Sequence, residues 1–252
     1  MRAWVGTSGF AFDAWRGPFY PEKLPARRML SHYASILRAV EINSTFYRLP
    51  TEKTLSTWST EVPDAFRFSL KASRYLSHHL GLGEAGKSAA RFFGLAERLG
   101  AKLGVVLVQL APHAKKDLGA LDAFLAELPR GTRVALELRD RTWDDDEVRD
   151  VLRDRGAALV VRETDAKITR KGAKPVTEVL PSETPLHRTA PFAYLRLRKE
   201  RYTPAELERW AERLSSSGHE EAFVFFKHED DGKGPCFAQA LAAALRARGV
   251  DA

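Results

Sequence analysis

The chain has 252 residues, enough to bury a large core as one barrel or as two small domains. Its 44% hydrophobic and 29% charged residues are ordinary for a globular protein, and its single cysteine excludes an intramolecular disulfide framework. No signal-like apolar run begins the chain and no apolar stretch is long enough to cross a membrane, so we expect a cytoplasmic protein without a membrane partner.

Basic residues exceed acidic ones, and the excess is unevenly placed. Lys and Arg number 40 against 33 Asp and Glu, which gives a net charge of +7 and a pI near 9.6. The segment Arg162–Arg201 holds ten basic and five acidic residues and supplies +5 of that charge. A basic surface attracts nucleic acid or anionic metabolites, so both are candidate partners.

Segments typical of strands and of helices alternate along the chain. Strands are predicted over Ala3–Thr7, Val40–Asn43, Phe66–Lys71, Gly104–Leu110, Arg133–Leu138, Ala158–Arg162, Phe192–Arg198 and Phe223–Lys227. Helices are predicted over Leu24–Leu37, Thr51–Thr60, Lys87–Leu99, Leu118–Leu128, Asp145–Arg155, Pro204–Leu214 and Phe237–Arg248. Thr51 and Thr203 are the expected N-cap residues of two of these helices.

This alternation predicts an α/β fold in which the strands pair in parallel through helical crossovers. Eight is the number of strands that closes a (β/α)₈ barrel. We therefore predict a single TIM-like barrel domain over residues 1–252, since no linker divides the chain. The irregular connection between strands six and seven, Glu163–Pro191, is rich in Pro, Thr and Lys and has no clear helical pattern. Long connections of this kind are often functional or mobile.

Side-chain alternation separates an apolar face from a polar face on most of these strands. In the second strand, Val40 and Ile42 share one face, and Glu41 and Asn43 share the other. The polar faces of the later strands carry Ser69, Lys71, Gln109, Glu137, Arg139, Tyr194, Arg196, Arg198 and Lys227. Because the apolar faces must meet the helices, we expect the polar faces to line the lumen. They cluster near the C-terminal strand ends, where barrel active sites lie.

The charges on these faces do not balance. Five cations, Lys71, Arg139, Arg196, Arg198 and Lys227, stand against the two carboxylates of Glu41 and Glu137. Buried charges are costly unless they are paired, so we expect a network, and an anionic ligand would balance the remaining cations. For any single residue, a purely structural ion pair remains the alternative interpretation.

At these strand ends the chain resembles the YecE-like proteins, catalogued as domain of unknown function 72. The resemblance covers nearly the whole chain and rests on several motifs together. They are Gly6-Thr7-Ser8-Gly9-Phe10, Trp15-Arg16-Gly17-Pro18-Phe19-Tyr20-Pro21, Glu41-Ile42-Asn43-Ser44-Thr45-Phe46-Tyr47, Phe68-Ser69-Leu70-Lys71-Ala72, Gly104–Pro112, Glu137-Leu138-Arg139 with Trp143, Tyr194-Leu195-Arg196-Leu197 and Phe225-Phe226-Lys227-His228. The resemblance implies a TIM-like barrel and implies no established activity.

The chain departs from the family pattern at two places. Arg198-Lys199 stands where many relatives have a histidine-glycine pair, which changes the charge offered to a ligand. Lys227-His228 stands where many have paired asparagine.

Roles are assigned to the candidate site residues from their chemistry. Glu41, Glu137 and Lys71 are the candidate catalytic residues, the two glutamates for acid/base work and the lysine for stabilising charge or forming a Schiff base. Candidate substrate-binding residues are Asn43, Tyr47, Gln109, Arg139, Arg196, Arg198 and Lys227. Tyr47 belongs to a group of aromatics on the first two strand-to-helix loops, which either stack on a ligand or form a loop core.

No cofactor is evident, because no P-loop or dinucleotide fingerprint occurs. We expect no metal either, because the site is cationic; the weak candidates for metal ligands are His78, His79 and Asp165.

Three functional hypotheses follow. The first is an enzyme acting on a phosphorylated or carboxylated small molecule, by hydrolase or isomerase/lyase-type acid/base chemistry. The second is a nucleic-acid-binding protein or nuclease that uses the basic segment 162–201. The third is a non-catalytic interaction module. The sequence gives no indication of the oligomeric state.

Overall fold

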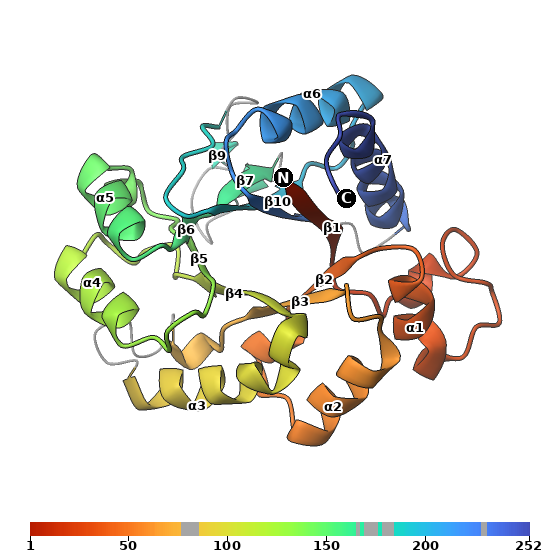
Figure 1. The fold of residues 1–252 in the computed structure, drawn as a ribbon, viewed down its shortest axis with the longest axis horizontal. Helices are drawn as coiled ribbons and strands as arrows, with labels where there is room; N and C mark the ends of the chain where they lie inside the picture. Colours follow the sequence, from red (N-terminus) through yellow and green to blue (C-terminus); the bar gives the residue numbers. More distant parts are fainter. Residues whose placement is uncertain (77–85, 165–166, 169–175, 178–183, 228–230) are drawn as a thin grey trace.

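The structure is a computed structural model that describes residues 1–76, 86–164, 167–168, 176–177, 184–227 and 231–252. A nine-stranded parallel sheet, nearly closed into a barrel, is surrounded by helices (Figure 1). The sheet strands are β1 (Arg2–Ser8), β2 (Ala39–Ile42), β3 (Arg67–Lys71), β4 (Leu103–Gln109), β5 (Val134–Glu137), β6 (Ala158–Leu159), β7 (Val161–Thr164), β10 (Phe192–Arg198) and β11 (Glu221–Phe226).

Seven α-helices belong to the described residues and lie outside this ring (Figure 1). They are α1 (Met29–Ala34), α2 (Glu52–Glu61), α3 (Gly86–Ala96), α4 (Leu118–Ala126), α5 (Asp146–Asp154), α6 (Pro204–Ser215) and α7 (Lys233–Ala247). The long connection before β10 includes two short strands, β8 (Lys167–Ile168) and β9 (Val176–Thr177), which pair antiparallel. None of the helices in the described ranges is long and apolar enough to cross a membrane.

The sixth predicted strand, Ala158–Arg162, is divided in two in the structure. Its first half, β6, pairs with β5, and its second half, β7, pairs with β10. Val160 lies at the break, and its amide donates a hydrogen bond to the Leu136 carbonyl at 3.0 Å. Because β6 and β7 stand at opposite ends of the sheet yet follow each other in the chain, the two ends of the sheet are drawn together. The predicted barrel is confirmed, with a break that alternation alone does not reveal.

The predicted N-caps are also confirmed. Thr51 accepts a hydrogen bond from the Thr54 amide at 3.1 Å, and Thr203 forms a capping box with Glu206 at the start of α6. These side chains satisfy amides that have no partner within the helix.

Two helix boundaries were wrong. In place of a helix over Leu24–Leu37, a 3-10 turn spans Ala26–Arg28 and the α-helix runs from Met29 to Ala34. Pro25 keeps Leu24 out of the helix, because a proline disfavours the helical conformation of the residue before it. The last helix begins at Lys233, four residues before the predicted start at Phe237. Pro235 is tolerated there because the amides of a first helical turn have no carbonyl partner within the helix.

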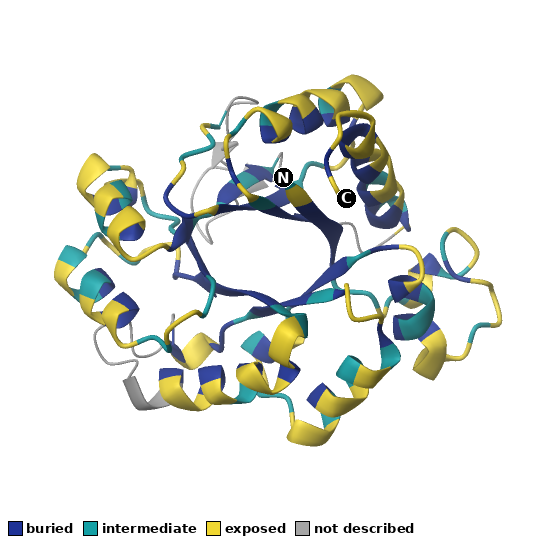
Figure 2. Ribbon diagram, viewed as in Figure 1, coloured by how far each residue is buried: buried dark blue, intermediate teal, exposed yellow. Residues whose placement is uncertain are grey.

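The core has two parts, one outside the ring of strands and one inside it. Val40, Phe68 and Leu195 belong to the outer cluster, which packs against the helices. The inner cluster fills the lower lumen and consists of Trp4, Ala39, Val105, Leu107, Ala135, Ala158, Ala190, Phe192, Tyr194, Phe223 and Phe225. In Figure 2 the strands are mostly buried, whereas the outer faces of the helices are exposed. The predicted division of strand faces is therefore confirmed.

Candidate functional site

Arg196 stands at the centre of a layer of charged side chains above the inner apolar cluster. It is fully buried, and its guanidinium binds Glu41 through two hydrogen bonds, Nε to Oε2 at 2.9 Å and Nη2 to Oε1 at 2.8 Å. Its Nη1 donates to Glu137 Oε2 at 2.5 Å. One guanidinium from β10 thus joins carboxylates from β2 and β5 across the lumen, in the bidentate geometry that arginine favours.

Glu41 is engaged on both carboxylate oxygens. Ser8, its register partner on β1, donates to Oε1 at 2.7 Å, and Asn43 donates to the same oxygen at 3.3 Å. The Tyr194 hydroxyl donates to Oε2 at 2.8 Å. Burial alone would raise the pKa of Glu41, but the charge and hydrogen bonds of Arg196 outweigh it and lower the pKa below its usual value. Glu41 is therefore ionised and held by several donors.

A hydrogen-bonded chain links Glu137 to Lys71. Gln109, opposite Glu137 in the β4–β5 register, donates to Glu137 Oε1 at 2.7 Å. Lys71 Nζ donates to Gln109 Oε1 at 2.7 Å and lies 3.9 Å from the centre of the Phe46 ring. Burial and the nearby Arg196 charge lower the pKa of Lys71 to about 8. Lys71 is therefore still protonated at neutral pH but loses its proton far more readily than an exposed lysine does.

Two more guanidiniums face Glu137. Arg139 Nε lies 3.9 Å from Glu137 Oε1, and Arg162 Nη1 lies 3.8 Å from the same oxygen. Burial would raise the pKa of Glu137, but the charges of Arg196, Arg198 and Arg162 prevail and lower it to about 2. Arg162 was not among the predicted site residues, although the alternation of Val161 and Glu163 with Arg162 along β7 places it on the lumen face.

Arg198 follows Arg196 on the same face of β10. Its Nε is buried and has no hydrogen-bond partner among the residues that the structure describes. Burial lowers the pKa of Arg198, and the charge of Arg196 lowers it further, to about 10. A buried charged donor without an acceptor is costly.

Two predicted binding residues lie outside this buried layer. Lys227 follows the last residue of β11, and its side chain is exposed. Tyr47 is 71% exposed and stands beside Phe46, with ring centres 5.1 Å apart. The layer still holds five cations, but their membership differs from the prediction, because it includes Arg162 and lacks Lys227.

The aromatics of the first strand-to-helix connection pack against one another. Trp15 and Tyr20 are buried, the rings of Phe19 and Tyr20 are 4.8 Å apart, and the Tyr20 hydroxyl donates to the Phe10 carbonyl at 2.6 Å. These contacts favour the loop-core interpretation of this group over ligand stacking.

The weak metal candidates His78, His79 and Asp165 lie outside the described residues. Within the described ranges, no group of three or more His, Cys, Asp or Glu side chains could hold a metal ion.

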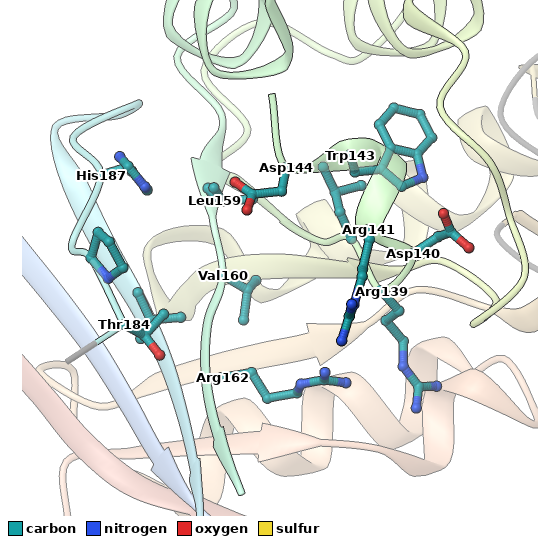
Figure 3. Close-up of a pocket in the computed structure, with 13 residues that line it drawn as sticks. Arg139, Asp140, Arg141, Trp143, Asp144, Leu159, Val160, Arg162, Thr184 and His187 are labelled. Atoms are coloured by element: carbon teal, nitrogen blue, oxygen red, sulfur yellow. The ribbon is translucent and has the colours of Figure 1, made fainter. Parts of the chain in front are cut away.

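A pocket of about 610 Å³ adjoins the charged layer. Its walls come from Leu138–Arg141 with Trp143 and Asp144, from Leu159–Arg162 on β6 and β7, and from Thr184, Pro185 and His187 before β10. Figure 3 shows the side chains of Arg139, Arg141 and Arg162 gathered toward one end, with His187 at the other. Arg139 and Arg162 thus belong both to the pocket wall and to the surroundings of Glu137.

The fold and the charged layer at the strand ends define a TIM-barrel-like protein. A family model described as "Protein of unknown function DUF72" matches residues 4–252, and the chain belongs to this family. Solved structures of DUF72 family proteins share the fold. One from Thermotoga maritima has a TM-score of 0.75 at 23% identity and covers 98% of this chain and 100% of that chain. One from Enterococcus faecalis has a TM-score of 0.76 at 19% identity and covers 97% and 95%.

Curated relatives match over part of their length. UPF0759 protein YecE from Escherichia coli is 31% identical over 111 residues, which cover 44% of this chain and 41% of the relative. UPF0759 protein YunF from Bacillus subtilis is 28% identical over 132 residues, which cover 49% and 47%. The matched region thus spans less than half of each relative. None of these names states an activity or a ligand.

Proposed function

We propose that the protein is an enzyme that binds an anionic small molecule at the C-terminal mouth of its barrel. The observation that carries this proposal is Arg198, whose buried Nε has no acceptor in the described structure. The charged layer around Arg198 also contains more cations than carboxylates. Among the described residues it holds five cations and two carboxylates: Lys71, Arg139, Arg162, Arg196 and Arg198 against Glu41 and Glu137. A bound anion supplies both the missing acceptor and the missing charge.

In this proposal Glu41 and Glu137 position Arg196 instead of transferring protons themselves. Both carboxylates are buried and hydrogen-bonded, and the pKa of Glu137 is lowered to about 2. An efficient general base has a pKa near the working pH, which neither carboxylate offers. Their task is to hold the Arg196 guanidinium in a fixed place below the anion.

Lys71 is the group suited to proton transfer. Its ammonium is held between Gln109 and the Phe46 ring, and its pKa of about 8 lies near neutrality. A lysine in this state both attracts an anion and gives a proton to a departing or enolised oxygen. This supports hydrolase or isomerase/lyase-type chemistry on a phosphorylated or carboxylated substrate.

Arg198→Met tests the binding of the anion. Inorganic phosphate and citrate are titrated by calorimetry, and the variant is expected to bind about tenfold more weakly or worse, because a hydrogen bond to a charged group is worth roughly 1.5–3 kcal/mol. The free variant is expected to be at least as stable as the wild type, since a buried charged donor without an acceptor is removed. Arg209→Met, on the exposed face of α6, is the matched control and leaves binding unchanged. Equal affinity in Arg198→Met and the wild type, or no anion binding at all, would overturn the proposal.

The pH dependence of binding tests Lys71. A protonated Lys71 attracts the anion, so affinity is expected to fall as the pH rises through about 8. In Lys71→Met the affinity is lower at pH 7, and this fall is absent. Calorimetric titrations of phosphate at pH 7, 8 and 9 measure both. An identical pH profile in the variant would exclude Lys71 from the site.

The nucleic-acid hypothesis depended on the basic segment Arg162–Arg201. Its residues Arg162, Arg196 and Arg198 are largely buried in the barrel, which leaves fewer of its charges for a nucleic-acid backbone. This hypothesis and that of a non-catalytic module remain predictions, and the geometry favours the small-molecule site.

A further inference from the structure

The break in the sixth strand opens the barrel wall beside the charged layer. β6 ends at Leu159 and β7 begins at Val161, and the two strands pair with different neighbours. The residues at this break, Leu159, Val160 and Val161, line the pocket of about 610 Å³. The pocket thus lies at the break and shares Arg139 and Arg162 with the charged layer.

The two ends of this pocket differ in chemistry. Arg139, Arg141 and Arg162 lie toward one end (Figure 3). The carboxylate of Asp140 binds residues outside this group of arginines: it accepts hydrogen bonds from Lys115 at 2.9 Å and from the Thr142 amide at 3.0 Å. Asp140 thus has other partners, and three arginine side chains gather at this end of the pocket.

The remaining wall joins an apolar surface, which is fixed in place, to the polar side chains of Asp144, Thr184 and His187. Leu138, Trp143, Leu159, Val160 and Pro185 supply this surface. The Trp143 indole is buried and donates to the Ala114 carbonyl at 2.8 Å, which holds the ring in one orientation. At the far end, burial lowers the pKa of His187, so its imidazole is neutral at neutral pH. Such a wall suits an uncharged ring that carries few polar groups.

The volume of the pocket favours an organic ligand over a bare ion. Small-molecule sites commonly enclose roughly 300–1,000 Å³, and this pocket lies within that range. A phosphate or carboxylate group alone would occupy the arginine end and leave the apolar wall in contact with water. Burying that wall against a ring is favourable in proportion to the apolar area covered.

We propose that the ligand is a phosphate monoester with a ring-sized organic body, its phosphate among Arg139, Arg162 and Arg198 and its body in the pocket at the Val160 break. This inference rests on the proposed function and specifies its substrate class. A phosphate monoester is favoured over a carboxylate because it carries a charge of roughly −1.5 to −2 at pH 7 and three acceptor oxygens, which suit a place where several arginines meet.

Calorimetry with inorganic phosphate and phenyl phosphate tests this assignment. Phenyl phosphate is expected to bind the wild type about tenfold more tightly, from burial of its ring. Val160→Phe fills the pocket and is expected to bring the affinity ratio close to one, while the affinity for inorganic phosphate stays unchanged. Pro185→Trp fills the same pocket from an exposed position that tolerates a larger side chain, so it serves if Val160→Phe fails to fold. Arg162→Met is expected to weaken both ligands by the same factor.

The outcomes separate this inference from the function on which it rests. If inorganic phosphate binds but phenyl phosphate binds no tighter, or if both filled pockets leave the ratio intact, the pocket does not hold the body of the ligand and the inference is overturned. If neither phosphate nor citrate binds, the proposed function itself fails.

Discussion

The lumen of the barrel has two layers that come from the same strands and differ in chemistry. Along β10, Phe192 and Tyr194 face the lower lumen with Trp4, Phe223 and other apolar side chains. Two residues further along the same face, Arg196 begins the charged layer. Alternation decides which side chains enter the lumen, and position along the strand decides whether they belong to the apolar layer or to the charged layer. The apolar layer therefore lies directly below the charged side chains and packs against them.

The layers also differ in how they tolerate change. In the lower layer Trp4 stacks on Phe223 with ring centres 4.8 Å apart, a contact that other apolar side chains can partly replace. In the upper layer each charge depends on its partners, because an ion left alone in the interior is far more costly than a small cavity. Substitutions in the two layers are expected to separate these behaviours.

The largest effect is expected from Arg196→Met. Removing this guanidinium leaves Glu41 and Glu137 buried without their main partner, and breaking a buried pair costs about 3–5 kcal/mol of the free energy of unfolding. Urea denaturation at pH 7 measures the loss. Neutralising all three charges, in Glu41→Gln/Glu137→Gln/Arg196→Met, is expected to recover part of it. A loss below about 1 kcal/mol, as for an exposed pair, would show that the layer is solvated.

The next effect is the acid dependence of stability. The pKa of Glu137 is about 2 in the folded protein and 4.5 in an unperturbed glutamate, so the unfolded chain binds protons first as the pH falls. The stabilisation is complete above pH 4.5 and is lost between pH 4.5 and about 2, on the order of 3 kcal/mol. Urea denaturation from pH 6 to pH 2 follows it. Glu137→Gln is expected to be less stable than the wild type at pH 6 and to lack this component, so the two stabilities converge near pH 2. An unchanged slope in the variant would contradict the assignment.

The smallest effect is expected in the lower layer. Phe223→Leu keeps an apolar side chain against Trp4 and is expected to cost roughly 1–2 kcal/mol, well below the truncation of a buried Phe to Ala. Because Phe223 holds no charge, the affinity for phosphate and the acid dependence are expected to stay as in the wild type. A large change in phosphate affinity would mean that the two layers are not independent.

Much of the fold and part of the site follow from the sequence. The two-residue period of strands such as Val40–Ile42 and Phe192–Arg198 assigns faces without knowledge of neighbours, since apolar side chains must meet the helices. The same period brings Glu41, Glu137 and Arg196 to one end of the lumen, where the structure joins them directly. Thr51 and Thr203 reveal helix starts because capping is a local interaction.

The features that the sequence did not predict depend on contacts between residues far apart in the chain. The break at Val160 reflects a change of pairing partner from β5 to β10, which leaves no mark in local hydrophobicity. Lys227 follows the alternation of β11, but the strand ends one residue earlier and the side chain is exposed. Alternation along β7 directs Arg162 to the lumen, but its position beside Glu137 depends on the pairing of β7 with β10. Alternation gives the direction in which a side chain points. The residue at which a strand ends depends on its pairing with neighbouring strands in the closed barrel.

The Arg196 network also bears on the order in which the chain assembles. Arg196 and Glu41 are 155 residues apart, and Arg196 and Glu137 are 59 apart. Until β10 docks between β7 and β11, both carboxylates lack their guanidinium, so a partly assembled barrel must keep them in water. We therefore expect desolvation of the three charges to accompany insertion of β10. Docking of β10 is therefore expected to be a late step in the assembly of the barrel.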